Sequence, residues 1–510
     1  MKKTTILCIL DGWGIGEKND SNPIYTANPK NYHYLKKNYK GGSLKSSGFA
    51  VGLPWGEPGN SEVGHLTLGS GRVLYQHYLK INDAIDSGDF FKNKALKKAY
   101  DHVNNNNSAL HLIGLLTEGA VHAHLDHLKA LIKMAHKNDI PHLYLHLFTD
   151  GRDSAPHSAG KLLKELKETI DREGKGGIAS IAGRYYGMDR DTNWNLVEKT
   201  YQMLMGKAPK KKIEDALQEA YDKDLTDEYV KPFIVKKRPI QNNDAVIFFN
   251  FREDRSRELA SSFIKPDFNK FKTKDLQNVY VATMTSYDKD LQNPVAFTSP
   301  KPKNVLGEVL ANNNKMQLRI SETQKYAHVT YFFNGLEEEP FENEYRILIP
   351  SEKIEHYNKR PRMRAEEITN RVTVSLQNNE FDFILMNYPN PDIIGHTGDY
   401  QAVTEAIKFI DNKLKKLAQT ALSNNHTLII TSDHGNAECL IDPQTGEKRT
   451  EHEANPVPFI IVDKEYKKES PSSGDLQRIG MLPDVAPTIL DLMNIQKPKE
   501  MTGNSVLDSL

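Results

Sequence analysis

The chain has 510 residues, which is too long for one ordinary domain, so we expect two or more. Its 67 basic and 67 acidic side chains give a net charge of zero, which argues against a general binder of nucleic acid or of membrane surfaces. Two cysteines exclude a disulfide framework, and no apolar run is long enough to cross a membrane, so we expect a cytoplasmic protein.

Three short apolar runs in the chain are each followed by acidic side chains. Each run has the length and the β-branched, apolar composition of a buried parallel strand, and together they are residues 5–10, 381–386 and 427–430. Because ligands in open α/β sheets gather at the carboxyl ends of the strands, we expect the side chains that follow the three runs to converge. Carboxylate and imidazole groups bind Mn²⁺ or Zn²⁺, so the pattern predicts a two-metal site. These side chains are Asp11, then Asp392 and His396, then Asp433 and His434.

One of these runs lies at the N-terminus and two lie near the C-terminus, so a shared sheet requires the middle of the chain to be an insertion. The middle has its own alternation of strands and helices, which is typical of a second α/β unit. In chain order we expect a strand at 109–116, a helix at 123–137, a strand at 142–148, a helix at 157–172, a strand at 178–182, a helix at 192–205, and strands at 245–250 and 279–284. Residues 400–422 predict an amphipathic helix beyond the insertion. The expected fold class is therefore α/β with two α/β domains, one of residues 1–76 and 311–510 and one of residues 77–310.

A serine stands among glycines in the segment from Gly59 to His65, at the start of an apolar, helical stretch. This residue, Ser61, can be only a helix N-cap, and that structural interpretation stays open. Beside a two-metal site its hydroxyl can also bind a divalent cation, lose its proton more easily and act as a nucleophile. We interpret His65 as structural rather than as a metal ligand.

Cationic side chains follow the predicted strands of the insertion. A single arginine after a strand is usually part of a surface ion pair of little energy. Several strand ends of one domain that all carry Arg or His instead predict a cationic cup, because guanidinium groups suit phosphate and carboxylate. The expected ligand is a small molecule with several negative charges, and nucleic acid is disfavoured because no aromatic stripe accompanies the arginines. The residues are His122, Arg152, Arg184, Arg190, Arg252, Arg255 and Arg257.

Two further segments carry candidate site residues. Lys325 lies among apolar and aromatic neighbours and can neutralise a phosphoryl group, although an ion pair with Glu322 explains it equally well. His452 stands in a loop just before a predicted strand at 459–462. A loop histidine is usually not a ligand, but two metals need more ligands than the three strand ends supply, so we include it.

Taken together, these motifs are similar to those of the cofactor-independent (2,3-bisphosphoglycerate-independent) phosphoglycerate mutases, a family of the alkaline phosphatase superfamily. The resemblance covers essentially the whole chain, and the motifs follow the family's order. They are Leu10–Gly14, Gly59–His65, Asn250–Arg257, Ser321–Val329, Asp392–Gly398 and Ser432–Glu438. The sequence departs from the family pattern at Pro58, Glu118, Ala120 and Gln324, and none of these departures removes a ligand.

The resemblance implies a phosphatase-like metal domain that is split in sequence around an inserted transferase-like domain. It also implies two Mn²⁺ ions. The first would be held by Asp392, His396 and His452, and the second by Asp11, Asp433, His434 and Ser61. The substrate-binding residues that the resemblance implies are His122, Arg152, Asp153, Arg184, Arg190, Arg252, Arg255 and Lys325.

The implied activity is that of an isomerase that interconverts 3-phosphoglycerate and 2-phosphoglycerate through a phosphoserine at Ser61. Asp153 is our candidate for the proton shuttle. One alternative is a related phosphomutase or phosphatase, although a plain phosphatase needs no second anion-binding domain. Another is an inactive anion-binding protein, which would have lost a ligand or the nucleophile. We expect a monomer whose partner is phosphoglycerate, with neither nucleic acid nor membrane involved.

Overall fold

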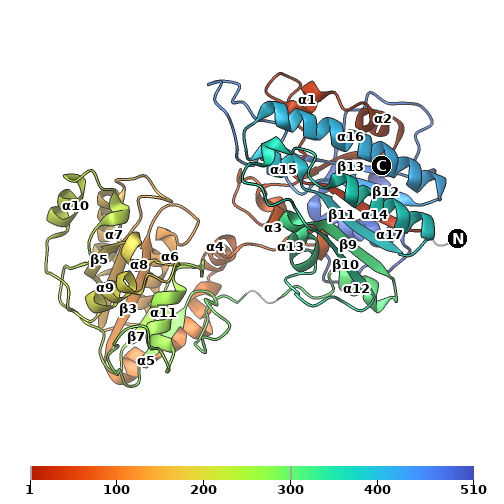
Figure 1. Ribbon diagram of the computed structural model, residues 1–510. Coiled ribbons are helices and arrows are strands. Elements are labelled where there is room, and N and C mark those ends of the chain that lie inside the picture. Colours follow the sequence, from red (N-terminus) through yellow and green to blue (C-terminus); the bar gives the residue numbers. More distant parts are fainter. Residues whose placement is uncertain (1–2, 299–300) are drawn as a thin grey trace. The chain divides into compact units, whose positions relative to one another are not determined.

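The computed structural model describes residues 3–298 and 301–510, and the chain divides into two compact units, each with its own sheet (Figure 1). One unit comprises Met1–Tyr75 and Pro300–Leu510, and the other comprises Gln76–Ser299. Two α/β units are present, and one of them is discontinuous in sequence. Within the described residues, no helix combines the length and the apolar character that crossing a membrane requires.

The second boundary lies earlier than the predicted residue 310. Residues from Pro300 onward belong to the discontinuous unit, which includes α12 (Leu306–Asn312). Leu306, Val309 and Leu310 are buried in a core that also contains Leu68. An amphipathic helix is assigned to the unit in which its apolar face is buried, and the sequence alone does not show which unit that is.

The discontinuous unit is built on an eight-stranded sheet with the order β10-β9-β11-β1-β12-β13-β2-β14. The central strand β1 lies between β11 and β12 and is parallel to both, so the three predicted runs are neighbours in one sheet. The strands are β1 (Thr5–Leu10), β2 (Gly41–Lys45), β9 (Gln317–Glu322), β10 (Glu344–Ile349), β11 (Phe383–Tyr388), β12 (Thr427–Thr431), β13 (Val457–Val462) and β14 (Arg478–Met481).

Alternate residues of β1 pack on opposite faces of this sheet. Ile6, Cys8 and Leu10 share one core with the helices on one side, and Leu7 and Ile9 share another core with the helices on the other side. The helices of the first face include α1 (Pro23–Ala27), α2 (Lys30–Asn38), α14 (Ala365–Asn378), α15 (Asn390–Gly395) and α16 (Tyr400–Ser423). Those of the second include α3 (Ser61–Ser70), α12 and α17 (Val485–Leu492). The long helix α16 confirms the amphipathic helix that the sequence predicts.

The other unit contains a six-stranded sheet with the order β6-β5-β4-β3-β7-β8. The short strand β6 is antiparallel to β5, and the remaining strands are parallel to their neighbours. The strands are β3 (Ala109–Leu116), β4 (His142–Thr149), β5 (Gly177–Gly183), β6 (Phe233–Ile234), β7 (Ala245–Phe248) and β8 (Tyr280–Thr283). The helices are α4 (His77–Ser87), α5 (Lys94–Asn106), α6 (Leu125–Lys137), α7 (Ala159–Glu173), α8 (Arg184–Gly187), α9 (Trp194–Leu204), α10 (Ile213–Tyr221) and α11 (Arg257–Ile264).

A buried chain of polar side chains crosses this second sheet. His111 on β3 lies 3.1 Å from the carboxylate of Asp244 and 2.9 Å from His146 on β4. His146 in turn contacts the Ser180 hydroxyl on β5 at 2.7 Å. Burial and the neighbouring His111 hold the pKa of His146 well below its usual range, so His146 is neutral in the folded protein.

The free energy of unfolding should therefore fall as the pH drops below about 6.5. In that range His146 binds a proton in the unfolded chain but stays neutral in the folded protein. His146 should contribute up to about 1.4 kcal/mol per pH unit between the unfolded pKa and the lower folded pKa. Urea unfolding at pH 7.5, 6 and 5 would measure this loss against a His146→Gln variant, whose slope should be shallower. Equal slopes for the two proteins would contradict the assignment.

Candidate functional site

Seven side chains that the sequence singles out meet at the carboxyl ends of β1, β11 and β12. The three strands lie side by side, so the residues that follow them come together although the first strand is hundreds of positions from the other two in sequence. Asp11 follows β1, Asp392 and His396 lie on and directly after α15, and Asp433 and His434 follow β12. Ser61 is the first residue of α3, and His452 lies in the loop before β13.

The ligand atoms of these residues form two overlapping groups. One atom each from Asp11, Asp433 and His434 lies within 4.8 Å of the others, and the same holds for Asp392, His434 and His452. His396 joins the second group, since its Nε2 lies 3.1 Å from Nε2 of His452 and 3.3 Å from Oδ1 of Asp392. His434 lies in both groups, whereas the family resemblance implies that it holds one ion. Buried carboxylates and imidazoles at this spacing fit divalent metal ions.

The three histidines are oriented by backbone carbonyl groups. In each ring Nδ1 contacts a carbonyl oxygen, and because such an oxygen can only accept, Nδ1 carries the proton. In the neutral ring this leaves the Nε2 lone pair facing the centre, where it can bind a metal ion. The pairs are His396 with Thr450 at 2.7 Å, His434 with Gly435 at 3.2 Å and His452 with Gly59 at 3.0 Å.

Lys325, on α13 (Thr323–Ala327), offsets the negative charge of this centre. Its Nζ lies 2.7 Å from Oδ1 of Asp11 and 2.6 Å from Oδ2 of Asp392. Burial alone would raise the pKa of Asp392, but Lys325 holds it well below its usual range. The alternative pairing with Glu322 is wrong, because that carboxylate accepts from the Ser351 hydroxyl at 3.0 Å and from a backbone N–H at 2.7 Å.

The hydroxyl of Ser61 lies inside this cluster. Its Oγ is 2.9 Å from Nε2 of His434 and 3.1 Å from Oδ1 of Asp11, and it accepts a hydrogen bond from Lys325 at 2.5 Å. Asn60, not Ser61, is the N-cap of α3, since the Asn60 side chain accepts from the Val63 N–H. The alternative that Ser61 only caps the helix is therefore wrong, and its hydroxyl is positioned as a nucleophile would be.

Sequence reasoning missed the residues that hold these loops in place. The buried carboxylate of Glu438 accepts hydrogen bonds from the N–H of Gly14 at 3.0 Å, the N–H of Asn436 at 2.8 Å and the side chain of Asn455 at 3.1 Å. It thus links the loops that follow β1 and β12 to the loop that carries His452. Burial raises the pKa of Glu438 to about 7. The motif Ser432–Glu438 contains this glutamate, but no local pattern shows that it contacts three loops.

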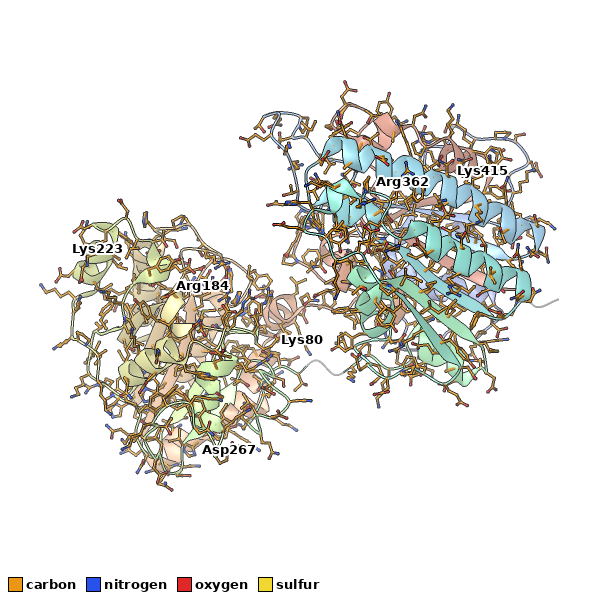
Figure 2. The ribbon with its side chains drawn as sticks, in the orientation of Figure 1. Lys80, Arg184, Lys223, Asp267, Arg362 and Lys415 are labelled. Carbon is orange, nitrogen blue, oxygen red and sulfur yellow. The ribbon has the colours of Figure 1, made fainter. Side chains whose placement is uncertain are left out.

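The predicted cationic residues gather at the carboxyl ends of β3, β4, β5 and β7. Arg184, the first residue of α8 (Figure 2), is buried and donates to Asp150 at 2.7 Å and to Asp153 at 2.8 Å. The same oxygen of Asp153 lies 3.1 Å from Nδ1 of His122. Burial would raise the pKa of Asp153, but His122 and Arg184 outweigh it and lower the pKa, so this group is a carboxylate at neutral pH.

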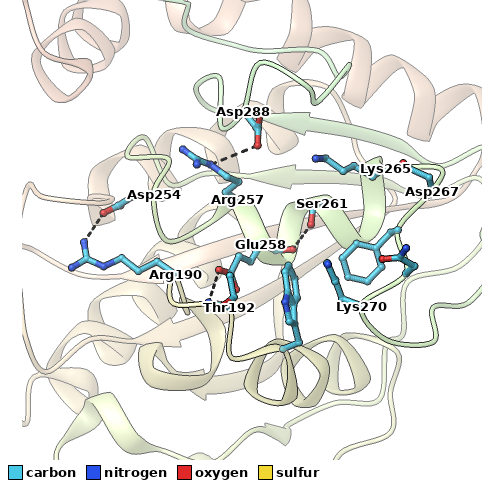
Figure 3. Close-up of a pocket in the computed structure, with 13 residues that line it drawn as sticks. Arg190, Thr192, Asp254, Arg257, Glu258, Ser261, Lys265, Asp267, Lys270 and Asp288 are labelled. Atoms are coloured by element: carbon cyan, nitrogen blue, oxygen red, sulfur yellow. Dashed lines mark hydrogen bonds and ion pairs between the residues drawn. The ribbon is translucent and has the colours of Figure 1, made fainter.

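Asp254 organises the other side of this cationic cluster, and sequence reasoning missed it. Its carboxylate lies 3.0 Å from Arg190, 3.4 Å from Arg252 and 3.5 Å from His122. Arg255 donates to a backbone carbonyl at 3.2 Å, and burial together with nearby arginines lowers its pKa. Arg152, whose side chain is 57% exposed, lies 3.6 Å from Glu228. Arg257 lines an adjoining cavity of about 440 Å³ (Figure 3).

Comparison with known proteins agrees with this geometry. A family profile described as BPG-independent PGAM N-terminus matches residues 81–289, and one described as type I phosphodiesterase / nucleotide pyrophosphatase matches residues 269–452. Proteins named 2,3-bisphosphoglycerate-independent phosphoglycerate mutase from Clostridium botulinum (strain ATCC 19397 / Type A) and Clostridioides difficile (strain 630) are 46% and 44% identical to this chain, and each alignment covers 99% of both chains. The chain belongs to the 2,3-bisphosphoglycerate-independent phosphoglycerate mutase family.

A solved structure of a phosphoglycerate mutase is also similar to this chain. A phosphoglycerate mutase from Leishmania mexicana, whose crystal structures were determined at low cobalt concentration, is similar over 99% of this chain and 97% of that chain. The sequence identity is 30% and the TM-score is 0.66. The resemblance to the phosphoglycerate mutase family and the predicted α/β class are confirmed.

The close approach of α3 to the end of β12 predicts that Gly64→Ala lowers turnover. A Cβ at Gly64 would lie 2.7 Å from the Cβ and the carbonyl oxygen of Asp433, so α3 and Ser61 would have to move. Overpacking of this kind costs roughly 1–3 kcal/mol of stability, and we expect at least a ~10-fold loss of turnover. Activity assays and thermal unfolding would measure both effects.

Gly160→Ala is the matched control, because an added Cβ at the helical Gly160 would have no close neighbour within 4 Å among the residues that the structure describes. That variant should keep full activity and be as stable as the native chain, or more stable by about 0.4–1 kcal/mol. Full activity in Gly64→Ala would show that the position of α3 does not control the nucleophile.

Proposed function

We propose that the protein interconverts 3-phosphoglycerate and 2-phosphoglycerate without 2,3-bisphosphoglycerate, and that Ser61 carries the phosphoryl group in turnover. The observation that carries the proposal is the position of the Ser61 hydroxyl, within 3.1 Å of Asp11, His434 and Lys325. Membership in the mutase family supports the same reaction. The 2,3-bisphosphoglycerate-independent phosphoglycerate mutases have this isomerase activity, and a phosphoserine intermediate is standard for them.

The candidate ligand groups suit divalent metal ions, and we propose two of them, most simply Mn²⁺. Asp392, His396 and His452 would hold one ion. Asp11, Asp433, His434 and Ser61 would hold the other. When bound, such ions would lower the pKa of the serine hydroxyl and offset the negative charge of the phosphoryl oxygens.

The residues around Ser61 are arranged for attack on phosphorus. Ser61 Oγ would form a bond to the phosphorus as the bond to the glycerate oxygen breaks, which leaves phosphoserine and glycerate. His434 Nε2 lies 2.9 Å from Oγ, so both atoms face the same ion position, and the hydroxyl would lose its proton to solvent when the ion binds. The Lys325 ammonium and the N-terminus of α3 would stabilise the negative charge that collects on the phosphoryl oxygens.

The cationic cluster would keep the glycerate while the phosphoryl group resides on the serine. His122, Arg152, Arg184, Arg190, Arg252 and Arg255 supply donors for its carboxylate and for the phosphate of the bound ester. Asp153 is the candidate proton shuttle, and its lowered pKa keeps it a carboxylate that would accept the proton of the second glycerate hydroxyl and return it to the oxygen that the phosphoryl group has left. The second glycerate hydroxyl would then attack the phosphoserine to give the isomeric product.

The nearest alternative is a phosphatase for another phosphate ester, and the cationic cluster favours the mutase. A hydrolase needs no donors that retain the dephosphorylated alcohol, whereas a mutase does. We further propose that the protein acts as a monomer in the cytoplasm, on a small molecule and without nucleic acid or membrane. Conversion of 3-phosphoglycerate with no added bisphosphoglycerate tests the reaction, and release of inorganic phosphate in place of the isomer would favour the phosphatase.

Ser61→Ala should abolish turnover and leave the fold intact. Loss of a covalent nucleophile should lower turnover by at least ~10³-fold. Mutase assays measure the loss, and mass spectrometry of protein quenched with substrate should place the phosphoryl group on Ser61 of the native chain. Ser70→Ala is the control, since Ser70 lies on the same helix and its hydroxyl donates to the backbone carbonyl of Arg72 at 3.2 Å. Turnover near the native value in Ser61→Ala would contradict a covalent phosphoserine intermediate at Ser61.

Removal of metal should abolish activity and lower the melting temperature. A ligand at 100 times its Kd stabilises a fold by about 2.7 kcal/mol, so readdition of Mn²⁺ after chelation should raise Tm. Asp392→Asn should lose most of this Mn²⁺-dependent rise. Asp442→Asn should keep it, because Asp442 is a loop carboxylate paired with Arg449. A rise of the same size in Asp392→Asn would place the metal elsewhere.

A further inference from the structure

One loop carries or contacts two of the arginines in the cationic cluster. The loop of residues 188–193, here called the Arg190 loop, joins α8 to α9. Its arginine lies 3.0 Å from Asp254, and the carbonyl oxygen of Met188 accepts a hydrogen bond from Arg255 at 3.2 Å. Any movement of this loop would therefore shift Arg190 and remove a contact that orients Arg255.

The Arg190 loop contains a strained residue. Thr192 has a φ of +61°, in the left-handed region that β-branched residues rarely adopt. Strained backbone persists only where the surrounding structure holds it, and it occurs preferentially at functional sites. Thr192 also lines the cavity next to the cluster, together with Arg190 and Asp254 (Figure 3).

The residue that holds Thr192 is Glu258, which belongs to a different element. It is the second residue of α11, it is 8% exposed, and its Oε1 accepts a hydrogen bond from the Thr192 N–H at 3.0 Å (Figure 3). On the other side of the strained residue, Asp189 accepts from the Asn193 N–H at 2.7 Å. The helix α11 directly follows the segment that carries Asp254. Glu258 therefore links the Arg190 loop to the segment whose carboxylate pairs with Arg190.

We infer that Glu258 is a positioning residue for the phosphoglycerate, because it holds Thr192 in its strained conformation and so keeps Arg190 beside Asp254 and Arg255 on the Met188 carbonyl. The inference rests on the proposed function, which assigns both arginines to the substrate. The N–H of Thr192 is a neutral donor, so the position requires an acceptor oxygen and not a negative charge. Burial and the nearby carboxylates of Asp189 and Asp191 raise the pKa of Glu258 to about 7, so the neutral form already occurs near neutral pH.

Four variants test this arrangement through KM and kcat for 3-phosphoglycerate. Glu258→Ala should raise KM about 10-fold and leave kcat nearly unchanged, because a misplaced Arg190 loses binding that is common to the ground state and the transition state. Glu258→Gln should keep the native KM, since its amide oxygen can still accept from Thr192. Asparagine adopts the left-handed region at lower cost than threonine, so the loop of the Thr192→Asn variant depends less on Glu258. The double variant Thr192→Asn/Glu258→Ala should therefore have a KM less than about threefold above that of Thr192→Asn alone.

Asp267→Asn is the matched control, because Asp267 is an exposed carboxylate that lines the same cavity and lies outside the Arg190 loop. Its KM should be native, and thermal unfolding should show that all variants are folded at the assay temperature. An unchanged KM in Glu258→Ala overturns the inference. So does an equal rise of KM in Glu258→Ala and Glu258→Gln, or a rise that Thr192→Asn does not reduce.

Calorimetry of 3-phosphoglycerate with the Ser61→Ala variant separates this inference from the proposed function. If that variant binds no 3-phosphoglycerate, the assigned substrate is wrong. If it binds, and the further change Glu258→Ala leaves the Kd unchanged, the substrate assignment stands and the role of Glu258 is wrong. A Kd about 10-fold weaker in the double variant supports both.

Discussion

The candidate metal site is dominated by the repulsion between three buried carboxylates, those of Asp11, Asp392 and Asp433. Water cannot screen these charges, so each needs a partner within hydrogen-bonding distance. Lys325 contacts the first two, and His65 lies 3.1 Å from the third. Burial and the charge of Asp433 still raise the pKa of Asp11 above its usual range. This remaining excess of negative charge is what a site for divalent cations requires.

The unit of residues Gln76–Ser299 has the opposite problem, because the arginines of its cationic cluster repel one another. Asp150 and Asp153 both pair with the buried Arg184, and Asp254 lies between Arg190 and His122. These carboxylates let the guanidinium groups approach one another and still leave donors for an anion. A small molecule with several negative charges matches such a cluster.

The sequence predicted most of the regular structure that positions both groups. The strand at 109–116 has those same bounds, and the helix predicted at 400–422 extends one residue further. Helix α5 is absent from the prediction, although Leu96, Ala99, Tyr100 and Val103 are buried at helical spacing. The boundary predicted at residue 310 was wrong, because packing and not local pattern assigns α12 to its unit.

By itself the sequence determined which strand ends carry carboxylates, histidines and arginines, because strand periodicity and the polar residue after each strand are local properties. Only the tertiary structure decided the partners. It placed Lys325 on Asp11 and Asp392 and not on Glu322, it made Asn60 and not Ser61 the cap of α3, and it brought Glu258 to the N–H of Thr192. These contacts join residues far apart in sequence, and their energies depend on burial, which exists only once the sheets and helices have packed.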